Sequence, residues 1–218
     1  MTTLTFPDDI LPASAMFGLQ SNTESFVSPL NRATQTVERP GALWKARLTF
    51  TTMSLQQQRK LQGFLAALNG MAGRVYLWPH GSSIADIAAL PVEATMVLDF
   101  LGQSYQVNGA PVVNGTMIDF NYLPSKYWPA NTLVLRAGEY LEAGGELKMV
   151  TGDVVSDASG TALVPVAPSF RSAPANLSII GLDKPKAFMR LASDVWEFVS
   201  TPAFRHDAFS VDFIEVPI

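Results

Sequence analysis

Apolar and polar residues alternate along Leu43-Trp44-Lys45-Ala46-Arg47-Leu48-Thr49-Phe50. In an extended chain, the apolar side chains from Trp44 to Phe50 share one face and the polar side chains from Lys45 to Thr49 share the other. The pattern therefore predicts a half-buried antiparallel strand. Such a strand needs neighbouring strands, and something packed on its apolar face.

A helix is predicted directly after this strand. Ser54 is a good N-cap, and Gln57 three residues later completes a capping box. Asn69-Gly70 supplies the end of the helix, and another strand is predicted within Gly73–Pro79. Apolar residues recur at helical spacing, and we expect them to form a stripe that faces a sheet: Leu61, Phe64, Leu65 and Leu68.

Short apolar stretches separated by turns continue from about Val92 to Pro168. Five or so short strands in this region favour a small closed barrel, for which an OB-like topology is the preferred interpretation. The expected strands are Val92–Leu98, Met117–Phe120, Leu133–Leu135, Glu146–Val150 and Ala162–Val166.

The last part of the chain returns to long alternating strands, at Lys186–Leu191 and Phe209–Glu215. Each has one apolar face, so each needs a sheet to join, and the first ninety or so residues supply one. We therefore expect a mainly β fold with two domains. Residues 1–88 and 186–218 form a discontinuous β-sandwich-like domain with one packed helix, and residues 89–185 form the inserted OB-like β-barrel domain.

The composition bounds the function. Charged residues make up 16% of the 218 residues, below the roughly 25% usual for soluble domains, which predicts that partner chains cover part of the surface. The net charge is −4 and the basic residues are scattered, so we expect no specific binding of nucleic acid. The absence of cysteine excludes disulfides and thiolate metal sites. No signal-peptide pattern is found at the N-terminus, and no apolar run approaches the ~20 residues of a membrane span.

Residues suited to catalysis are few. The two histidines, His80 and His206, both lie in predicted turns, and neither starts a zinc motif. Asp8-Asp9 and the pair Glu139/Glu142 could be read as catalytic carboxylates or calcium ligands. Asp153 and Asp157 come closest to a calcium loop, but they lack its closing bidentate Glu. We therefore expect no enzyme activity, no metal and no cofactor.

Three aromatic residues, Tyr122, Tyr127 and Trp128, cluster in what is predicted to be a proline-bounded loop. Exposed aromatic rings can stack on sugars, and they also anchor protein interfaces. The sequence leaves both interpretations open.

Three stretches of the chain carry a family resemblance. The first is the strand–helix–strand region from Gly41 to Pro79. The second is Leu135-Arg136-Ala137-Gly138-Glu139-Tyr140 with the strand and the Asp157-Ala158-Ser159-Gly160 turn that follow. The third is the pair of C-terminal strands. Together they resemble the distal tail proteins of siphophages, with Glu139 where that family usually has Asp.

The resemblance implies a structural subunit of the virion tail, assembled in the cytoplasm of the bacterial host. It implies a homohexameric ring, a baseplate hub that joins the tail tube protein to tail-tip, hub or fibre proteins, with no membrane insertion. Residues 1–40 resemble nothing in the family, and we expect them to form an arm. The competing interpretation is a carbohydrate-binding module that contacts host surface glycans. An enzyme that uses His80 or Glu139 is a third.

Overall fold

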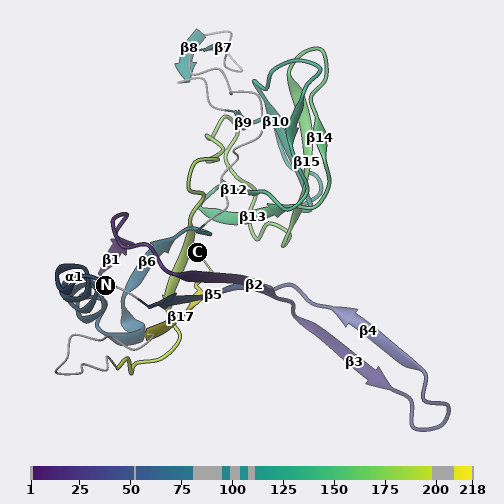
Figure 1. The fold of residues 1–218 in the computed structure, drawn as a ribbon. Coiled ribbons are helices and arrows are strands. Elements are labelled where there is room, and N and C mark those ends of the chain that lie inside the picture. The colour runs from purple at the N-terminus through teal and green to yellow at the C-terminus, as the bar shows by residue number, and fades with distance from the viewer. Residues whose placement is uncertain are drawn as a thin grey trace. The chain divides into compact units, whose positions relative to one another are not determined.

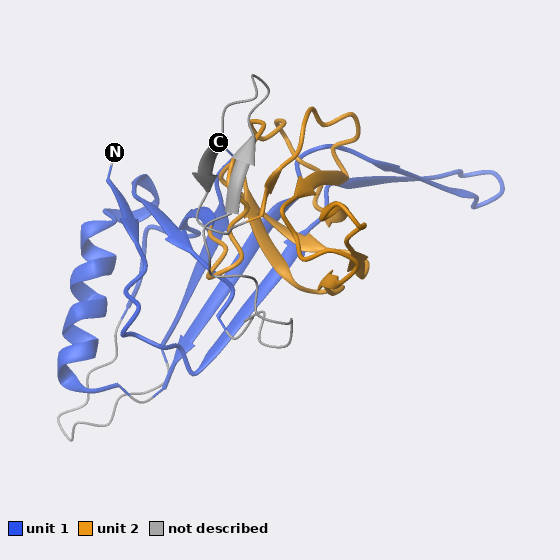
Figure 2. Cartoon of the chain, turned by 90° about the horizontal axis from the view of Figure 1, so that it is seen from above, with its two compact units in different colours: residues 1–80, 187–218 blue, residues 81–186 orange. Residues whose placement is uncertain are grey.

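The computed structural model describes residues 2–51, 53–80, 95–98, 104–107, 111–197 and 209–217. The fold is mainly β: among the described residues 43% lie in strands, and the sheets are curled. The chain divides into two compact units (Figure 2): unit 1 comprises residues 1–80 and 187–218, and unit 2 comprises residues 81–186. The boundary expected between residues 88 and 89 lies outside the described residues.

Unit 1 is built on a six-stranded sheet with the order β1-β6-β16-β17-β5-β2 (Figure 1). Its strands are β1 (Thr3–Thr5), β2 (Ser14–Gln20), β5 (Leu43–Phe50), β6 (Arg74–Leu77), β16 (Ala187–Leu191) and β17 (Phe209–Glu215). Neighbouring strands are antiparallel, except that β1 runs parallel to β6. β16 pairs with β6, and β17 pairs with β5. This confirms the prediction that the C-terminal strands complete a sheet begun at the N-terminus.

The predicted alternation of β5 is confirmed. Its apolar side chains from Trp44 to Phe50 are buried, and Lys45 and Arg47 on the opposite face are exposed. At the end of the neighbouring strand, the buried Glu215 carboxylate accepts a hydrogen bond from the Trp44 backbone N–H at 2.8 Å.

The helix α1 (Leu55–Ala67) begins as predicted. The Gln57 backbone N–H donates to Ser54 Oγ at 3.2 Å, and the Ser54 backbone N–H donates to Gln57 Oε1 at 3.0 Å. The buried stripe differs from the prediction, because Gln58 is only 4% exposed and Phe64 is only half-buried. Gln58 lies three residues before Leu61 and seven before Leu65, so it shares their helical face, and Phe64 flanks that face. The Phe64 ring contacts Phe6 edge-on at a centroid distance of 5.5 Å.

The turn after α1 ties two distant segments of unit 1 together. Asn69 and Gly70 adopt φ angles of 52° and 64°, and the short 3-10 helix η1 (Gly70–Ala72) follows. Asp194 Oδ1 accepts a hydrogen bond from the Met71 backbone N–H at 2.8 Å. A Cβ atom at Gly70 would lie 2.5 Å from the same oxygen. Glycine is therefore required for this turn to close on Asp194.

Only part of the first forty residues forms an arm. β1 and β2 belong to the sheet of unit 1, contrary to the expectation of an arm over residues 1–40. Strands β3 (Thr23–Val27) and β4 (Thr34–Glu38) form a separate hairpin in which every residue is exposed. This hairpin, which we call the arm, extends from the β2–β5 end of the sheet (Figure 1).

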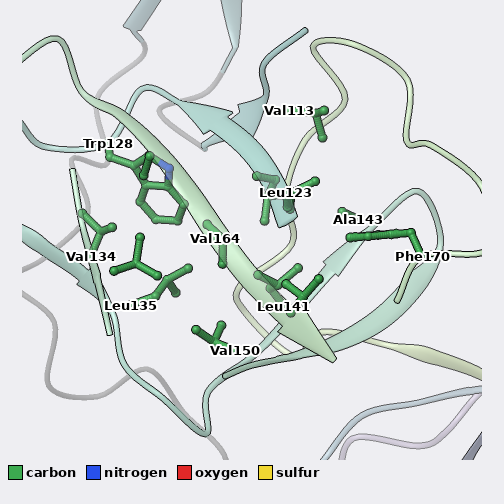
Figure 3. Close-up of a cluster of buried hydrophobic side chains, with 14 of the residues drawn as sticks. Val113, Leu123, Trp128, Val134, Leu135, Leu141, Ala143, Val150, Val164 and Phe170 are labelled. Atoms are coloured by element: carbon green, nitrogen blue, oxygen red, sulfur yellow. The ribbon is translucent and has the colours of Figure 1, made fainter. Parts of the chain in front are cut away.

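Unit 2 contains a five-stranded sheet, β12-β13-β15-β10-β9, together with the pairs β11–β14 and β7–β8. Its buried side chains form one cluster around Trp128, Leu123 and Val164 (Figure 3). The strands are β7 (Thr95–Leu98), β8 (Ser104–Val107), β9 (Val112–Val113), β10 (Tyr122–Lys126), β11 (Leu133–Leu135), β12 (Tyr140–Ala143), β13 (Glu146–Val150), β14 (Val154–Val155) and β15 (Thr161–Ala167).

One predicted strand of unit 2 is wrong. Met117–Phe120 is not extended, and the strand lies instead at Tyr122–Lys126, where a loop was expected. The Asp119 side chain accepts from the Asn121 backbone N–H at 2.9 Å, and the Tyr122 backbone N–H donates to the Asp119 carbonyl at 3.1 Å. These bonds form a turn that ends any extended conformation before Tyr122.

Candidate interaction surfaces

The three aromatic residues singled out in the sequence do not form one exposed group. Tyr122 is 43% exposed, whereas Trp128 is only 4% exposed. Tyr127 is half-buried and lies between them in the chain with a φ of 71°, and the Lys126 ammonium lies 5.0 Å from its ring centroid.

The Trp128 ring belongs to the core of unit 2. It points into the cluster of buried side chains shown in Figure 3. Its Nε1–H donates to Ser125 Oγ at 2.8 Å, and the Ser125 hydroxyl in turn donates to the Ala162 carbonyl at 2.8 Å. The indole is therefore fully satisfied inside the unit, and the ring offers no open face to a ligand in this conformation.

Tyr122 instead lies on an exposed apolar face of the five-stranded sheet. It pairs with Pro165, and Pro124 pairs with the exposed Leu163. Because paired residues of antiparallel strands point to the same side, all four side chains share this face. Burial alternates along Thr161–Ala167, where the odd-numbered residues are the less buried ones, but the residue types do not alternate, so no signal in the sequence marks this face.

The acidic residues considered as possible ligands accept hydrogen bonds from backbone N–H groups. Glu139 Oε2 accepts from Arg136 at 2.8 Å, and Glu142 Oε2 accepts from Lys186 at 3.0 Å. Asp153 Oδ1 accepts from Ala137 at 2.9 Å. Each carboxylate thus fixes a local turn or crossing of the chain. Among the described residues, no group of three or more His, Cys, Asp and Glu side chains is placed to hold a metal ion.

Asp157 closes the hairpin before β15. Its Oδ1 accepts from the Ser159 hydroxyl at 2.6 Å and from the Ser159 and Thr161 backbone N–H groups at 2.8 Å each. These hydrogen bonds, led by that of the Ser159 hydroxyl, hold the pKa of the exposed Asp157 below its ordinary value. The carboxylate stabilises the turn predicted at Asp157–Gly160.

His80 packs in the aromatic core of unit 1. The centroid of its ring lies 5.0 Å from that of Trp78 and 5.6 Å from that of Phe6. His206, the other histidine, lies outside the described residues. The described structure therefore brings no second histidine to His80.

Unit 1 carries an open hollow of about 600 Å³ on the sheet face that bears Lys45 and Arg47. Gly18, Lys45 and Ile214 lie side by side across β2, β5 and β17. Two residues further along the same face, Arg47 Nε of β5 donates to Asp212 Oδ1 of β17 at 2.6 Å. The absence of a side chain at Gly18 helps to open this hollow.

The arm is the other exposed apolar feature of unit 1. Phe26 is 56% exposed and Val37 is 48% exposed. Glu24 pairs with Val37, and Phe26 pairs with Gln35, so Phe26 and Val37 lie diagonally on one face of the hairpin. Arg39 Nη2 bonds to Glu24 Oε2 at 2.6 Å on this same face.

Within the described part of the chain, no helix combines the length and the apolar character that a bilayer crossing requires. Comparison of the chain with protein-family models and with curated proteins finds no significant match.

Proposed function

We propose that this chain is a non-enzymatic structural subunit of a siphophage tail, a distal tail protein that forms a homohexameric ring. The ring joins the tail tube protein to tail-tip, hub or fibre proteins. In this proposal the six-stranded sheet and α1 form the ring-building β-sandwich domain, and unit 2 is an OB-like barrel inserted in the sequence between β6 and β16.

The observation that carries the proposal is the interrupted sheet of unit 1. β6 and β16 are neighbours in the sheet, although all of unit 2 separates them in the sequence. The stretches that resemble distal tail proteins supply both sides of this interruption and the Arg136–Tyr140 turn inside unit 2. The family resemblance implies this same order, an inserted domain within a ring-forming domain.

Surface chemistry supports an assembled state. Only 16% of the residues are charged, and large apolar side chains such as Phe26, Leu30 and Met16 are exposed on unit 1. Exposed apolar groups with few charges between them are typical of surfaces that partners cover. A ring made by head-to-tail contacts would cover such surfaces on each subunit.

Electron microscopy tests the proposal. Negatively stained preparations of the purified chain are expected to contain six-fold rings, and an epitope tag on the chain should label the junction of tube and tip in intact tails. Labelling at any other place in the virion would exclude the proposed role.

The alternative is a carbohydrate-binding module that contacts host surface glycans through the exposed face around Tyr122 and Leu163. The burial of Trp128 removes one of the rings on which this alternative rested. Saturable binding of bacterial surface polysaccharide, lost in Tyr122→Ala and retained in Val155→Ala, would favour it. Val155 is an exposed apolar residue on another strand of the same unit.

A further inference from the structure

The sheet face of unit 1 that bears Lys45 carries a row of side chains in direct register. Lys45 on β5 is paired with Ile214 on β17, and Ile214 is paired with Arg190 on β16. Paired residues of antiparallel strands point to the same side of a sheet. The three side chains therefore form a cation–apolar–cation row, which we call the basic row, and all three line the hollow of about 600 Å³.

The two cations of the basic row form no ion pair with any residue that the structure describes. The carboxylate of Asp212, which also lines the hollow, is committed to Arg47. Arg47 Nε donates to its Oδ1 at 2.6 Å and Nη2 donates to its Oδ2 at 2.9 Å. Arg190 Nη1 donates to a neutral acceptor, the Leu191 carbonyl, at 3.0 Å. The hollow thus presents two uncompensated positive charges, in a chain whose net charge is −4.

Apolar surface lies between and beside these charges. Ile214 separates the two cations in the row. Gly18 pairs with Lys45 and leaves bare backbone there, and Met16 in the same hollow is 63% exposed. A nucleic-acid backbone would neutralise the cations and leave the apolar surface in water. An acidic polypeptide can pair with the cations and cover the apolar surface as well.

The spacing of the basic row defines the segment that fits it. Neighbouring strands lie about 4.8 Å apart, so the backbones at Lys45 and Arg190 are about 10 Å apart across β17. Along an extended chain, alternate residues share one face and lie about 6.7 Å apart. A segment with acid, apolar and acid residues at alternate positions can place its apolar side chain on Ile214. Its two carboxylates are then within reach of the two long basic side chains.

A similar pattern occurs in this chain, but its carboxylates are already used. Asp153, Val155 and Asp157 are exposed at alternate positions. Asp153 Oδ1 accepts from the Ala137 backbone N–H at 2.9 Å, and Asp157 Oδ1 accepts from three groups of the hairpin that it closes. Ion pairs with the basic row would compete with these hydrogen bonds. The segment that fits the row best is one whose carboxylates are free.

We propose that the basic row binds an extended acidic segment of a partner protein, in which acid, apolar and acid residues occupy alternate positions. The carboxylates pair with Lys45 and Arg190, and the apolar side chain between them covers Ile214. Charge complementarity of this kind speeds association and fixes the register of the bound segment. The site goes beyond the proposed ring, because it takes up a different protein on the surface of a single subunit.

Fluorescence anisotropy with a labelled peptide tests the site. The probe is Glu-Ser-Leu-Ser-Glu-Ser-Leu-Ser-Glu, which places glutamate and leucine on one face when it is extended. The full-length wild type should bind it saturably, with an affinity that falls as the salt concentration rises. The control peptide Glu-Leu-Ser-Ser-Glu-Ser-Ser-Leu-Glu has the same composition and charge, but its leucines lie on the other face. It should bind about fivefold more weakly or worse.

Charge-reversal variants locate the binding. Lys45→Glu and Arg190→Glu should each weaken binding of the first peptide about tenfold or more, because each replaces an attraction by a repulsion. Arg59→Glu is the matched control, since it makes the same change at an exposed position of α1, and it should leave the affinity unchanged. Thermal melts check that the variants fold. Arg190 is half-buried, so Arg190→Gln is measured beside Arg190→Glu and should also weaken binding.

Four results would overturn the proposal. Absence of saturable binding to the wild type would show that the row is no binding site. An equal loss of affinity in Arg59→Glu would show that the overall charge of the chain controls binding. Tighter binding of a single-stranded oligothymidylate, lost in Lys45→Glu and Arg190→Glu, would assign the row to nucleic acid. Self-association of the wild type that Lys45→Glu abolishes in sedimentation velocity would assign it to a second copy.

Discussion

Ser125→Ala tests whether Trp128 is a core residue of unit 2 or a ligand contact. Ser125 and Trp128 are both buried. Ser125 Oγ accepts the indole N–H at 2.8 Å while its own proton goes to the Ala162 carbonyl at 2.8 Å. The alanine substitution removes both bonds and leaves the indole N–H without an acceptor inside a dry core.

The expected loss of stability follows from the loss of these two hydrogen bonds. The hydroxyl's own hydrogen bond contributes about 1 kcal/mol, and leaving the buried N–H unsatisfied costs about 1–3 kcal/mol. We expect Ser125→Ala to lower the free energy of unfolding by about 2–4 kcal/mol. In a Trp128→Phe background the N–H is absent, so the same substitution should cost only about 1 kcal/mol. The coupling energy of the pair is then about 1–3 kcal/mol.

Urea unfolding of the wild type, both single variants and the double variant measures this coupling. Far-ultraviolet circular dichroism is the suitable signal, because Trp128→Phe removes one of the four tryptophans and so alters the fluorescence signal itself. Additive effects of the two substitutions would refute the buried hydrogen bond. Such a result would mean that water reaches the indole, and Trp128 would again be a candidate for glycan stacking.

Three further outcomes are expected. Leu65→Ala should lower the free energy of unfolding of unit 1 by about 2–5 kcal/mol in urea. Leu55→Ala, the same change at an exposed position of α1, should change it by no more than about 0.5 kcal/mol. Equal losses of stability in the two variants would show that the buried face of the helix is wrongly assigned. Gly160→Ala should cost more than about 1 kcal/mol, because φ is +74° and the new Cβ would lie 2.4 Å from the Trp128 carbonyl oxygen; an unchanged urea midpoint would contradict this. The stabilisation by Asp157 is present above its ordinary pKa of 3.8 and lost as pH falls through its lower folded value, so wild type and Asp157→Ala should converge in melts at low pH.

Local patterns in the sequence predicted the elements whose causes are local. The capping box of Ser54 and Gln57 depends only on residues three apart, and it forms as predicted. The alternation of β5 and β17 needs only the two-residue period of a strand, and both strands bury the expected side chains. Turns set by Asp157 or Asn69 also follow from the chemistry of the residue itself.

The sequence did not predict features that depend on distant neighbours. Lys148 and Glu146 read as polar positions of a strand, yet both are buried, and Lys148 Nζ donates to Glu146 Oε2 at 2.6 Å and to the Ser169 carbonyl at 3.1 Å. Burial of such a pair depends on the segment after β15 crossing over it, where the Arg171 backbone N–H also donates to Glu146. A single sequence does not show which segment will cross.

The prediction for the aromatic candidate site failed in part because the sequence does not show which segments pack together. Trp128 was predicted to lie in a loop because prolines bound its segment, and proline usually marks a loop. In the structure Pro124 lies inside β10, with buried Leu123 and Ser125 on either side. The alternation of burial along this strand, which places Ser125 beside the indole, prevails over the preference of proline for loops.

The insertion of unit 2 in the sequence between two neighbouring strands of unit 1 leads to a last prediction. Leu77 at the end of β6 pairs directly with Ala187 at the start of β16. Paired residues of antiparallel strands lie about 5 Å apart, so a linker of about four residues from His80 to Ala187 is long enough to replace residues 81–186. The shortened chain should keep the complete six-stranded sheet, since unit 2 contributes no strand to it. We expect it to unfold cooperatively in urea, and Leu65→Ala should cost the same free energy there as in the full chain. An aggregated or unfolded shortened chain, beside a folded full-length protein, would show that unit 1 depends on unit 2 for its stability.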